Sequence, residues 1–356
     1  MTELVNSVAS REWATGQDGT VRLALIGLGW WTTEEVLPAL EDSSFCEATV
    51  AVSGSKENAN SLVEDWETLE RGLTYDEFQN GIGVDAYDAV YICTPNAFHC
   101  QYAESAAELG KDVLCEKPME STVERAERMV TACEDAGVDL MIGYRLQTDP
   151  VVRHARELVQ DGAIGQPTHV LGNNSQSLLE INADPDQWRL DPEISGDGTS
   201  VMDLGIYPLN TARFILDANP VGVQSMMHST DEAFADVPDE RAVFSLSLDD
   251  GSYVTATASQ NSHGTTHLRV IGTDGELLLE PAFHMQTDLR IDRPKGRVTV
   301  SPAEINQMTE LFDYFADRVL GDAPIEPDGH HGVVDMKTMR AIYQAARDGE
   351  TVLIDE

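Results

Sequence analysis

Short apolar runs alternate with amphipathic segments through the first 145 residues of the chain. The runs are nearly continuous in Val, Leu, Ile and Ala, which is typical of strands buried on both faces of a parallel sheet. We expect strands at 21–26, 47–52, 87–93, 112–115 and 139–145, helices at 32–40, 59–69, 96–109 and 121–137, and a helical turn at 75–78. This alternation predicts an α/β fold with a doubly wound parallel sheet.

Local signals sharpen some of these boundaries. Thr32 or Thr33 is expected to cap the first helix, Asn96 to cap the helix at 96–109, and Ser121 with Glu124 to form a capping box. Gly110 and Gly137 predict the ends of the two later helices.

The pattern changes after residue 145. A helix is predicted at 150–160, and then runs with a period of two appear at 168–174, 221–228, 242–248, 252–259, 266–271, 275–280 and 298–300. Such alternation favours an open, mostly antiparallel sheet with one solvated face. Helical stretches are expected at 201–216, 302–320 and 333–347. We therefore divide the chain into an N-terminal arm (1–20), a dinucleotide-binding domain (21–145) and an α+β domain for substrate binding and oligomerisation (146–356).

The stretch after the first strand carries a candidate nucleotide site. The strand ends in the turn Gly27, Leu28, Gly29, Trp30 and Trp31, and Thr32 stands where a third glycine is usual. Glycines let the backbone approach a pyrophosphate, and a helix N-terminus presents unpaired N–H groups to it. The turn predicts a Rossmann-type cofactor site, although a lone GxG also occurs in ordinary turns.

The end of the second strand indicates which dinucleotide binds. An acidic residue commonly follows this strand in NAD-binding folds, but here the chain reads Ser53, Gly54, Ser55 and Lys56. Two hydroxyls and an ammonium favour a 2′-phosphate and therefore NADP. The alternative is a plain solvent-exposed loop.

Charge excludes several classes of partner. Lys and Arg number 23 against 62 Asp and Glu, which gives a net charge of −39. This surface repels nucleic acid and anionic membranes. We interpret it as a coat adapted to molar salt, where the Debye length is about 3 Å, rather than as that of an ordinary acidic protein.

Cysteine and histidine usage also limits the possibilities. The five cysteines contain no CxxC pair, which favours reduced thiols and a cytoplasmic location, and we find neither a signal peptide nor a spanning segment. The nine scattered histidines show no spacing typical of metal ligands, so no metal is expected.

Candidate chemistry follows from where the strands end, because ligands of doubly wound sheets bind beyond their carboxyl ends. Thr94, Pro95 and Asn96 lie at one such end, and Glu116, Lys117 and Pro118 at the next. Lys117 is suited to hydrogen-bonding a substrate hydroxyl, or it is a bland surface lysine.

Two further candidates lie in the second half. Asp203 and Tyr207 are four residues apart and share a helix face, where a nearby ammonium would lower the phenol pKa. Trp188 and Arg189 are suited to stacking on and hydrogen-bonding a sugar. The alternatives are a helix-terminal acid, a packing tyrosine and a core tryptophan.

Taken together, these segments resemble the Gfo/Idh/MocA oxidoreductase family, which includes glucose–fructose oxidoreductase. The resemblance spans about residues 20–350 and rests on the glycine turn and three later marks: Thr94, Pro95, Asn96 and His99; Glu116, Lys117 and Pro118; Asp203, Gly205 and Tyr207. It implies cofactor contacts from Thr94, Pro95, Asn96, His99, Glu116 and Lys117. Many inositol-type members carry His where Tyr207 stands, so Tyr207 is similar to the aldose-oxidising branch. Asp197 interrupts the glycine-rich turn that the family has before Asp203.

The resemblance implies an NADP-dependent dehydrogenase that oxidises the anomeric carbon of an aldopyranose, with D-xylose going to its lactone as the first candidate reaction. Lys117, Asp203 and Tyr207 would be catalytic, and the same three residues with Trp188 and Arg189 would bind the sugar. It also implies a homodimer or homotetramer. Three alternatives stay open: a related glucose, inositol or polyol dehydrogenase, a sugar–sugar oxidoreductase that retains its cofactor, and a nucleotide-binding sensor without turnover.

Overall fold

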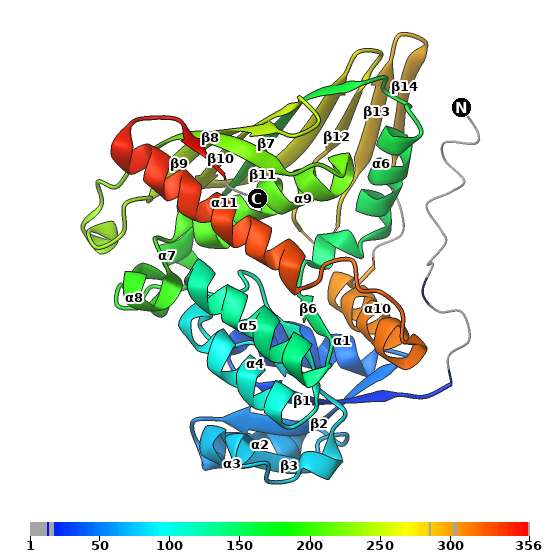
Figure 1. Cartoon of the computed structure of the whole chain (residues 1–356), viewed down its shortest axis with the longest axis vertical. Coiled ribbons are helices and arrows are strands. Elements are labelled where there is room, and N and C mark those ends of the chain that lie inside the picture. Colours follow the sequence, from blue (N-terminus) through cyan, green and yellow to red (C-terminus); the bar gives the residue numbers. More distant parts are fainter. Residues whose placement is uncertain (1–12, 14–17, 285, 302–304, 355–356) are drawn as a thin grey trace. The chain divides into compact units, whose positions relative to one another are not determined.

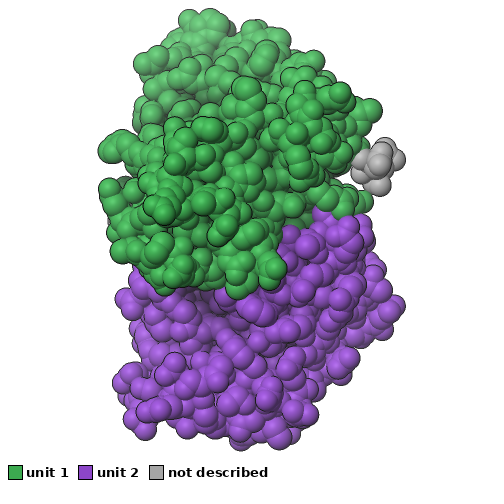
Figure 2. Space-filling view, turned by 90° about the vertical axis from the view of Figure 1, so that its left-hand side faces the viewer, with its two compact units in different colours: residues 1–10, 146–305, 334–356 green, residues 11–145, 306–333 purple. Residues whose placement is uncertain are grey.

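The computed structural model describes residues 13, 18–284, 286–301 and 305–354. Most of the predicted arm therefore lies outside the described residues. The chain forms two compact units (Figure 2): a parallel-sheet unit of residues 11–145 and 306–333, and a large-sheet unit of residues 1–10, 146–305 and 334–356. The sequence prediction had assigned everything after residue 145 to the second domain.

The parallel-sheet unit is built on six strands in the order β3-β2-β1-β4-β5-β6, all paired in parallel. Their bounds are β1 Val21–Ile26, β2 Cys46–Ser53, β3 Arg71–Thr74, β4 Ala89–Ile92, β5 Asp112–Cys115 and β6 Leu140–Ile142. The order reverses between β1 and β4, where doubly wound sheets bind ligands. The predicted parallel sheet is confirmed, and β3 is an addition that the apolar pattern did not reveal.

Helices cover this sheet (Figure 1). They are α1 Leu37–Glu41, α2 Lys56–Asp65, α3 Tyr75–Gln79, α4 His99–Glu108, α5 Val123–Ala136 and α10 Gln307–Gly321. Helix α10 packs against α1, β1 and β2, which is why residues 306–333 belong to this unit. Its described part starts at Gln307 with Asn306 as the cap, and residues 302–304 of the predicted helix lie outside the described residues. Trp13 is buried against Tyr314 of α10, with ring centroids 5.3 Å apart.

Three predicted helix caps are wrong in detail. Thr32 and Thr33 are inside a helical turn, and their hydroxyls donate to the carbonyls of Gly27 and Trp30. A 3₁₀ turn, Asn96–Phe98, precedes α4, and no side chain caps either element in this described stretch. The cap of α5 is Thr122, which accepts from the Arg125 N–H, so the helix begins one residue later than predicted, and the Ser121 hydroxyl donates to Glu120.

The large-sheet unit contains nine strands in the order β14-β13-β12-β11-β7-β10-β9-β8-β15 (Figure 1). Only β7 and β10 pair in parallel among these described strands, and the remaining neighbours are antiparallel. The bounds are β7 Pro167–Ser177, β8 Pro220–His228, β9 Arg241–Leu248, β10 Tyr253–Ser259, β11 Asn261–Gly272, β12 Glu276–Leu279, β13 Leu289–Arg293, β14 Gly296–Val300 and β15 Val352–Leu353. The mostly antiparallel sheet is confirmed, and β13 and β15 were not predicted.

One face of the large sheet is covered by helices. They are α6 Pro150–Gln160, α9 Ile206–Leu216 and the part of α11 (Gly329–Asp348) from residue 334 onward. Helix α9 packs against β7, β10 and α6, and the Arg156 guanidinium of α6 lies 4.3 Å from the ring centroid of Phe214 in α9. Burial alternates along β9 and β10, so alternate side chains face the core. Among the described residues, no helix is long and apolar enough to cross a membrane.

Candidate functional site

The glycine turn after β1 has the geometry of a dinucleotide cradle. Gly27 has φ +98°, and a Cβ there would lie 2.3 Å from the Cys93 carbonyl oxygen, so only glycine fits. A Cβ on Gly29 would meet no described atom within 4 Å, which leaves its outer side open. The Thr32 hydroxyl donates to the Gly27 carbonyl over 2.7 Å, and this bond stabilises the conformation of the turn. These features fit a pyrophosphate lying against the Gly27–Gly29 backbone.

The loop after β2 places a cation beside an acid that sequence reasoning missed. Ser55 caps α2, and Lys56 Nζ lies 2.5 Å from Glu77 Oε2. The same carboxylate oxygen accepts the Thr74 N–H over 2.8 Å, which closes a capping box at the start of α3. The Lys56 bond, followed by the Thr74 N–H, lowers the pKa of Glu77. The lysine predicted to receive a 2′-phosphate is therefore already paired with a carboxylate.

His99 joins the two loops that follow β4 and β5. Its Nε2 lies 2.8 Å from the Thr94 carbonyl oxygen and its Nδ1 lies 3.2 Å from that of Met119. Its side chain is buried. A second link runs from Arg125, which bonds Glu120 and donates to the carbonyl of Ala97. The structure thus places His99 as a brace of the Thr94–Asn96 segment.

Glu116 fixes the backbone at Lys117. The Tyr91 hydroxyl donates to Glu116 Oε1 over 2.7 Å, and the Lys117 N–H donates to Glu116 Oε2 over 3.1 Å. Burial, with the nearby Glu116 carboxylate, raises the pKa of Tyr91 well above its usual value. Tyr91 is therefore a neutral donor that orients Glu116. It was not a sequence candidate because it lies inside a buried strand.

Asp203 and Arg189 come together in the large-sheet unit. Asp203 lies in the π-type turn Val201–Gly205, which leads directly into α9 and Tyr207. Asp203 Oδ2 accepts from Arg189 Nε over 3.3 Å, and the Arg189 guanidinium carbon lies 4.5 Å from the ring centroid of Trp188. The Tyr207 ring centroid is 5.8 Å from that of Phe283. An aromatic ring, a guanidinium and a carboxylate therefore share one surface, which is suited to a polyhydroxylated ligand.

A buried carboxyl group holds the start of this helical segment. Asp239 accepts the N–H groups of Thr199 and Val201, each over 2.8 Å, and the Tyr343 hydroxyl of α11 over 2.7 Å. Burial raises the pKa of Asp239 to about 6, although these hydrogen bonds by themselves lower it. Burial, followed by the adjacent Asp239, raises the pKa of Tyr343 well above its usual value.

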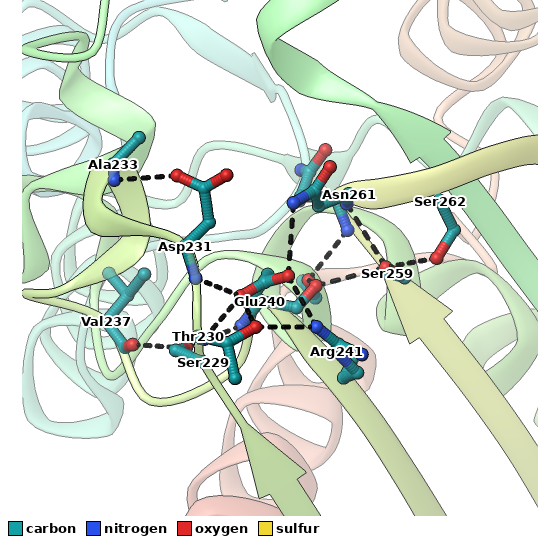
Figure 3. Close-up of polar contacts among 12 residues, drawn as sticks. Ser229, Thr230, Asp231, Ala233, Val237, Glu240, Arg241, Ser259, Asn261 and Ser262 are labelled. Carbon is teal, nitrogen blue, oxygen red and sulfur yellow. Dashed lines mark hydrogen bonds and ion pairs between the residues drawn. The ribbon is translucent and has the colours of Figure 1, made fainter.

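The next residue, Glu240, holds the loop that follows β8 (Figure 3). Its Oε2 accepts the N–H groups of Thr230 and Asp231 over 2.5 and 2.9 Å. Its Oε1 accepts from Arg241 over 2.8 Å and from Asn261 over 3.1 Å. Burial by itself raises the pKa of Glu240, but these donors lower it to about 2.

That loop supports the segment carrying Trp188 and Arg189. Phe234 and Val237 from the loop form a small apolar cluster with Leu178 and Leu190, which flank the segment. Glu240 thus anchors a loop whose apolar side chains pack against Leu190, the neighbour of Arg189. Among the described residues, no group of three or more His, Cys, Asp or Glu side chains is placed to hold a metal ion.

Both halves of the chain match known families. Residues 21–144 match the model of an oxidoreductase family with an NAD-binding Rossmann fold, and residues 152–278 match the Gfo/Idh/MocA C-terminal domain.

Individual relatives match over nearly the whole chain. D-xylose 1-dehydrogenase [NADP(+)] of Haloarcula marismortui is 49% identical over 97% of each chain, and D-xylose 1-dehydrogenase (NADP(+)) 2 of Haloferax volcanii is 30% identical over 94% of this chain and 98% of its own. The crystal structure of aldose–aldose oxidoreductase from Caulobacter crescentus, complexed with glycerol, aligns with a TM-score of 0.88 and 32% identity over 94% of this chain and 99% of its own. The chain therefore belongs to the Gfo/Idh/MocA family of oxidoreductases.

Proposed function

We propose that this protein is an NADP-dependent sugar dehydrogenase that oxidises the anomeric carbon of an aldopyranose, D-xylose to D-xylonolactone. The observation that carries the proposal is the 49% identity to the Haloarcula marismortui enzyme over 97% of both chains. The net charge of −39 supports a protein that works at molar salt, because salt at that concentration screens the self-repulsion of such an acidic surface.

The parallel-sheet unit would hold the cofactor. Gly27, Leu28, Gly29, Trp30 and Trp31 would face the pyrophosphate, and Ser53, Ser55 and Lys56 the 2′-phosphate. Thr94, Pro95, Asn96, Glu116 and Lys117 would border the nicotinamide, with His99 bracing their loops through two backbone carbonyls. When bound, the nicotinamide supplies the acceptor for the hydride that leaves C1.

Three side chains would act on the sugar. Tyr207 would accept the proton of the C1 hydroxyl, Lys117 would stabilise the developing oxyanion, and Asp203 would be the third catalytic group. Loss of the proton from oxygen and of the hydride from carbon leaves the C1 carbonyl of a lactone. Trp188 and Arg189 bind the remaining sugar face. A reversed assignment, with Lys117 as the base, uses the same residues.

The first experiment is reduction of NADP⁺ and of NAD⁺ with D-xylose and with D-glucose in molar KCl, followed at 340 nm. The proposal expects D-xylose and NADP⁺ to give the highest kcat/KM. Preference for D-glucose would indicate a related aldose dehydrogenase, and absence of any sugar-dependent reduction would indicate a nucleotide-binding sensor. Tyr207→Phe and Lys117→Met then test the roles, since full activity in both would rule these residues out.

A second candidate function is aldose–aldose oxidoreduction with a retained cofactor. It is favoured by the TM-score of 0.88 and 32% identity to the Caulobacter crescentus enzyme. Nicotinamide absorbance that stays with the protein through desalting, together with lactone formation without added NADP⁺, would support it. Complete release of the cofactor on desalting would contradict it.

We further propose a cytoplasmic homodimer or homotetramer with a small sugar as its partner. The structure describes no disulfide bond among the five cysteines, which favours a reducing compartment. Apolar side chains exposed on the strands of the large sheet favour self-association: Leu171, Val221, Met226 and Tyr253. Light scattering in molar KCl measures the assembly, and a monomer at micromolar concentration would contradict it.

A further inference from the structure

Gln260 contacts the candidate catalytic carboxylate from a distant part of the chain. It lies between β10 and β11, its side chain is 0% exposed, and its Nε2 donates to Asp203 Oδ2 over 2.9 Å across 57 residues of sequence. An ionised carboxylate only accepts hydrogen bonds, so the amide nitrogen must face Asp203. The amide oxygen then faces Gln176, which donates to it over 2.8 Å.

The main chain of Gln260 carries a separate structural role. Its N–H donates to Ser200 Oγ over 3.0 Å and to the Glu240 carbonyl over 3.1 Å, and its own carbonyl accepts the Leu178 N–H over 2.7 Å. These bonds hold the backbone whichever side chain is present. Substitutions of the side chain therefore separate its effect on Asp203 from the folding of this segment.

We propose that Gln260 is a positioning residue for the dehydrogenase reaction, which sets the orientation of the Asp203 carboxylate. The inference rests on the proposed function, in which Asp203 acts at the sugar site. Gln260 and Arg189 converge on the same oxygen of Asp203 and fix the plane of the carboxylate. The amide does so without a charge of its own, whereas Arg189 brings a positive charge to that oxygen. An amide hydrogen bond to a charged group is among the stronger ones in proteins.

The test uses Gln260→Met, which keeps the length but cannot donate, and Gln260→Glu, which donates only when protonated. Gln224→Met on β8 is the control, because the described side-chain hydrogen bond of Gln224 is to the Thr351 hydroxyl, away from Asp203. We expect Gln260→Met to lower kcat about 10- to 100-fold with the melting temperature nearly unchanged, and the control to lower it less than about twofold. The Kd for D-xylose, measured from tryptophan fluorescence, should change much less than kcat.

Gln260→Glu supplies a readout that a merely structural role would not move. The ratio of its kcat to that of wild type should rise as the pH falls, because the introduced carboxyl group, once protonated, again donates to Asp203. The same ratio for Gln260→Met should stay flat. If Gln260→Met unfolds, the pH dependence of Gln260→Glu still decides the question.

Asp203→Asn separates the two possible failures. Wild-type kcat in Gln260→Met, or a flat ratio for Gln260→Glu, would overturn the positioning role if Asp203→Asn is inactive. An active Asp203→Asn would instead overturn the role of Asp203 in the proposed function, and the positioning inference would fall with it.

Discussion

Asp239 and Glu240 are consecutive residues whose carboxyl pKa values are shifted in opposite directions. Burial raises the pKa of Asp239 to about 6. Burial also acts on Glu240, but the N–H groups of Asp231 and Thr230, with Arg241 and Asn261, lower its pKa to about 2. One dipeptide therefore holds the start of the Asp203 segment through a group that ionises reluctantly and the loop after β8 through a group that ionises readily.

The first prediction concerns Asp239→Asn. The folded state keeps the Asp239 proton up to a pKa of about 6 whereas an unfolded chain loses it near 3.8, so this group's contribution to stability falls as the pH rises through that window. The shift corresponds to about 3 kcal/mol. Asp239→Asn lacks this ionisation, so its free energy of unfolding relative to wild type should improve by up to that amount between pH 4 and pH 7. Guanidinium unfolding at both pH values measures it, and a constant difference would contradict it.

Glu240→Gln should show the opposite dependence. Its lowered pKa means that the carboxylate stabilises the fold above an unfolded value near 4.5, and that this contribution is lost as the pH falls toward 2. The variant should therefore be less stable than wild type at pH 7, with a difference that shrinks in acid. Faster hydrogen exchange of the Thr230 and Asp231 amides should accompany the substitution, and unchanged exchange would argue against the clamp.

Gly27→Ala and Gly29→Ala form a matched pair in the glycine turn. At Gly27 the added methyl meets the Cys93 carbonyl at a strained backbone conformation, so we expect a loss of about 2–4 kcal/mol in unfolding free energy. At Gly29 the methyl meets nothing within 4 Å of the described protein, so stability should be unchanged while the KM for NADP⁺ rises. Equal melting temperatures for the two variants would contradict this geometry.

The Lys56–Glu77 pair predicts how the choice of cofactor can be changed. Lys56→Met should raise the KM for NADP⁺ about 10-fold and leave that for NAD⁺ unchanged, because the ammonium would contact only the 2′-phosphate. Glu77→Gln keeps an oxygen for the Thr74 N–H but removes the charge that neutralises Lys56, so the KM for NADP⁺ should fall about threefold. Parallel changes for NAD⁺ and NADP⁺ would show instead that the loop had moved.

The sequence predicted what local pattern encodes. Buried runs such as 112–115 revealed the parallel sheet because apolar side chains follow one another without alternation, as in Val113 and Leu114, and β5 has those bounds. Strand β3 was not predicted because Leu73 is its only large apolar side chain. Strand β13 was missed although Leu289 and Ile291 alternate with Arg290 and Asp292, because the pattern lasts only five residues.

The site was less accessible to such reasoning. Its candidate residues could be named from motifs, because glycine turns and strand ends are local features. Tyr91, Gln260 and Glu77 could not be named, since their roles depend on partners 25, 57 and 21 residues away. The predicted cap at Ser121 was wrong by one residue, since Thr122 is the residue that accepts the Arg125 N–H.

The hydroxyl of Thr32 has a practical consequence for protein engineering. A strict three-glycine search would pass over this chain, yet the threonine in the third place is bonded to the first glycine's carbonyl over 2.7 Å. Restoring the consensus with Thr32→Gly would remove that fastening and add backbone freedom at the same point. In this chain, consensus design would therefore make the glycine turn more flexible.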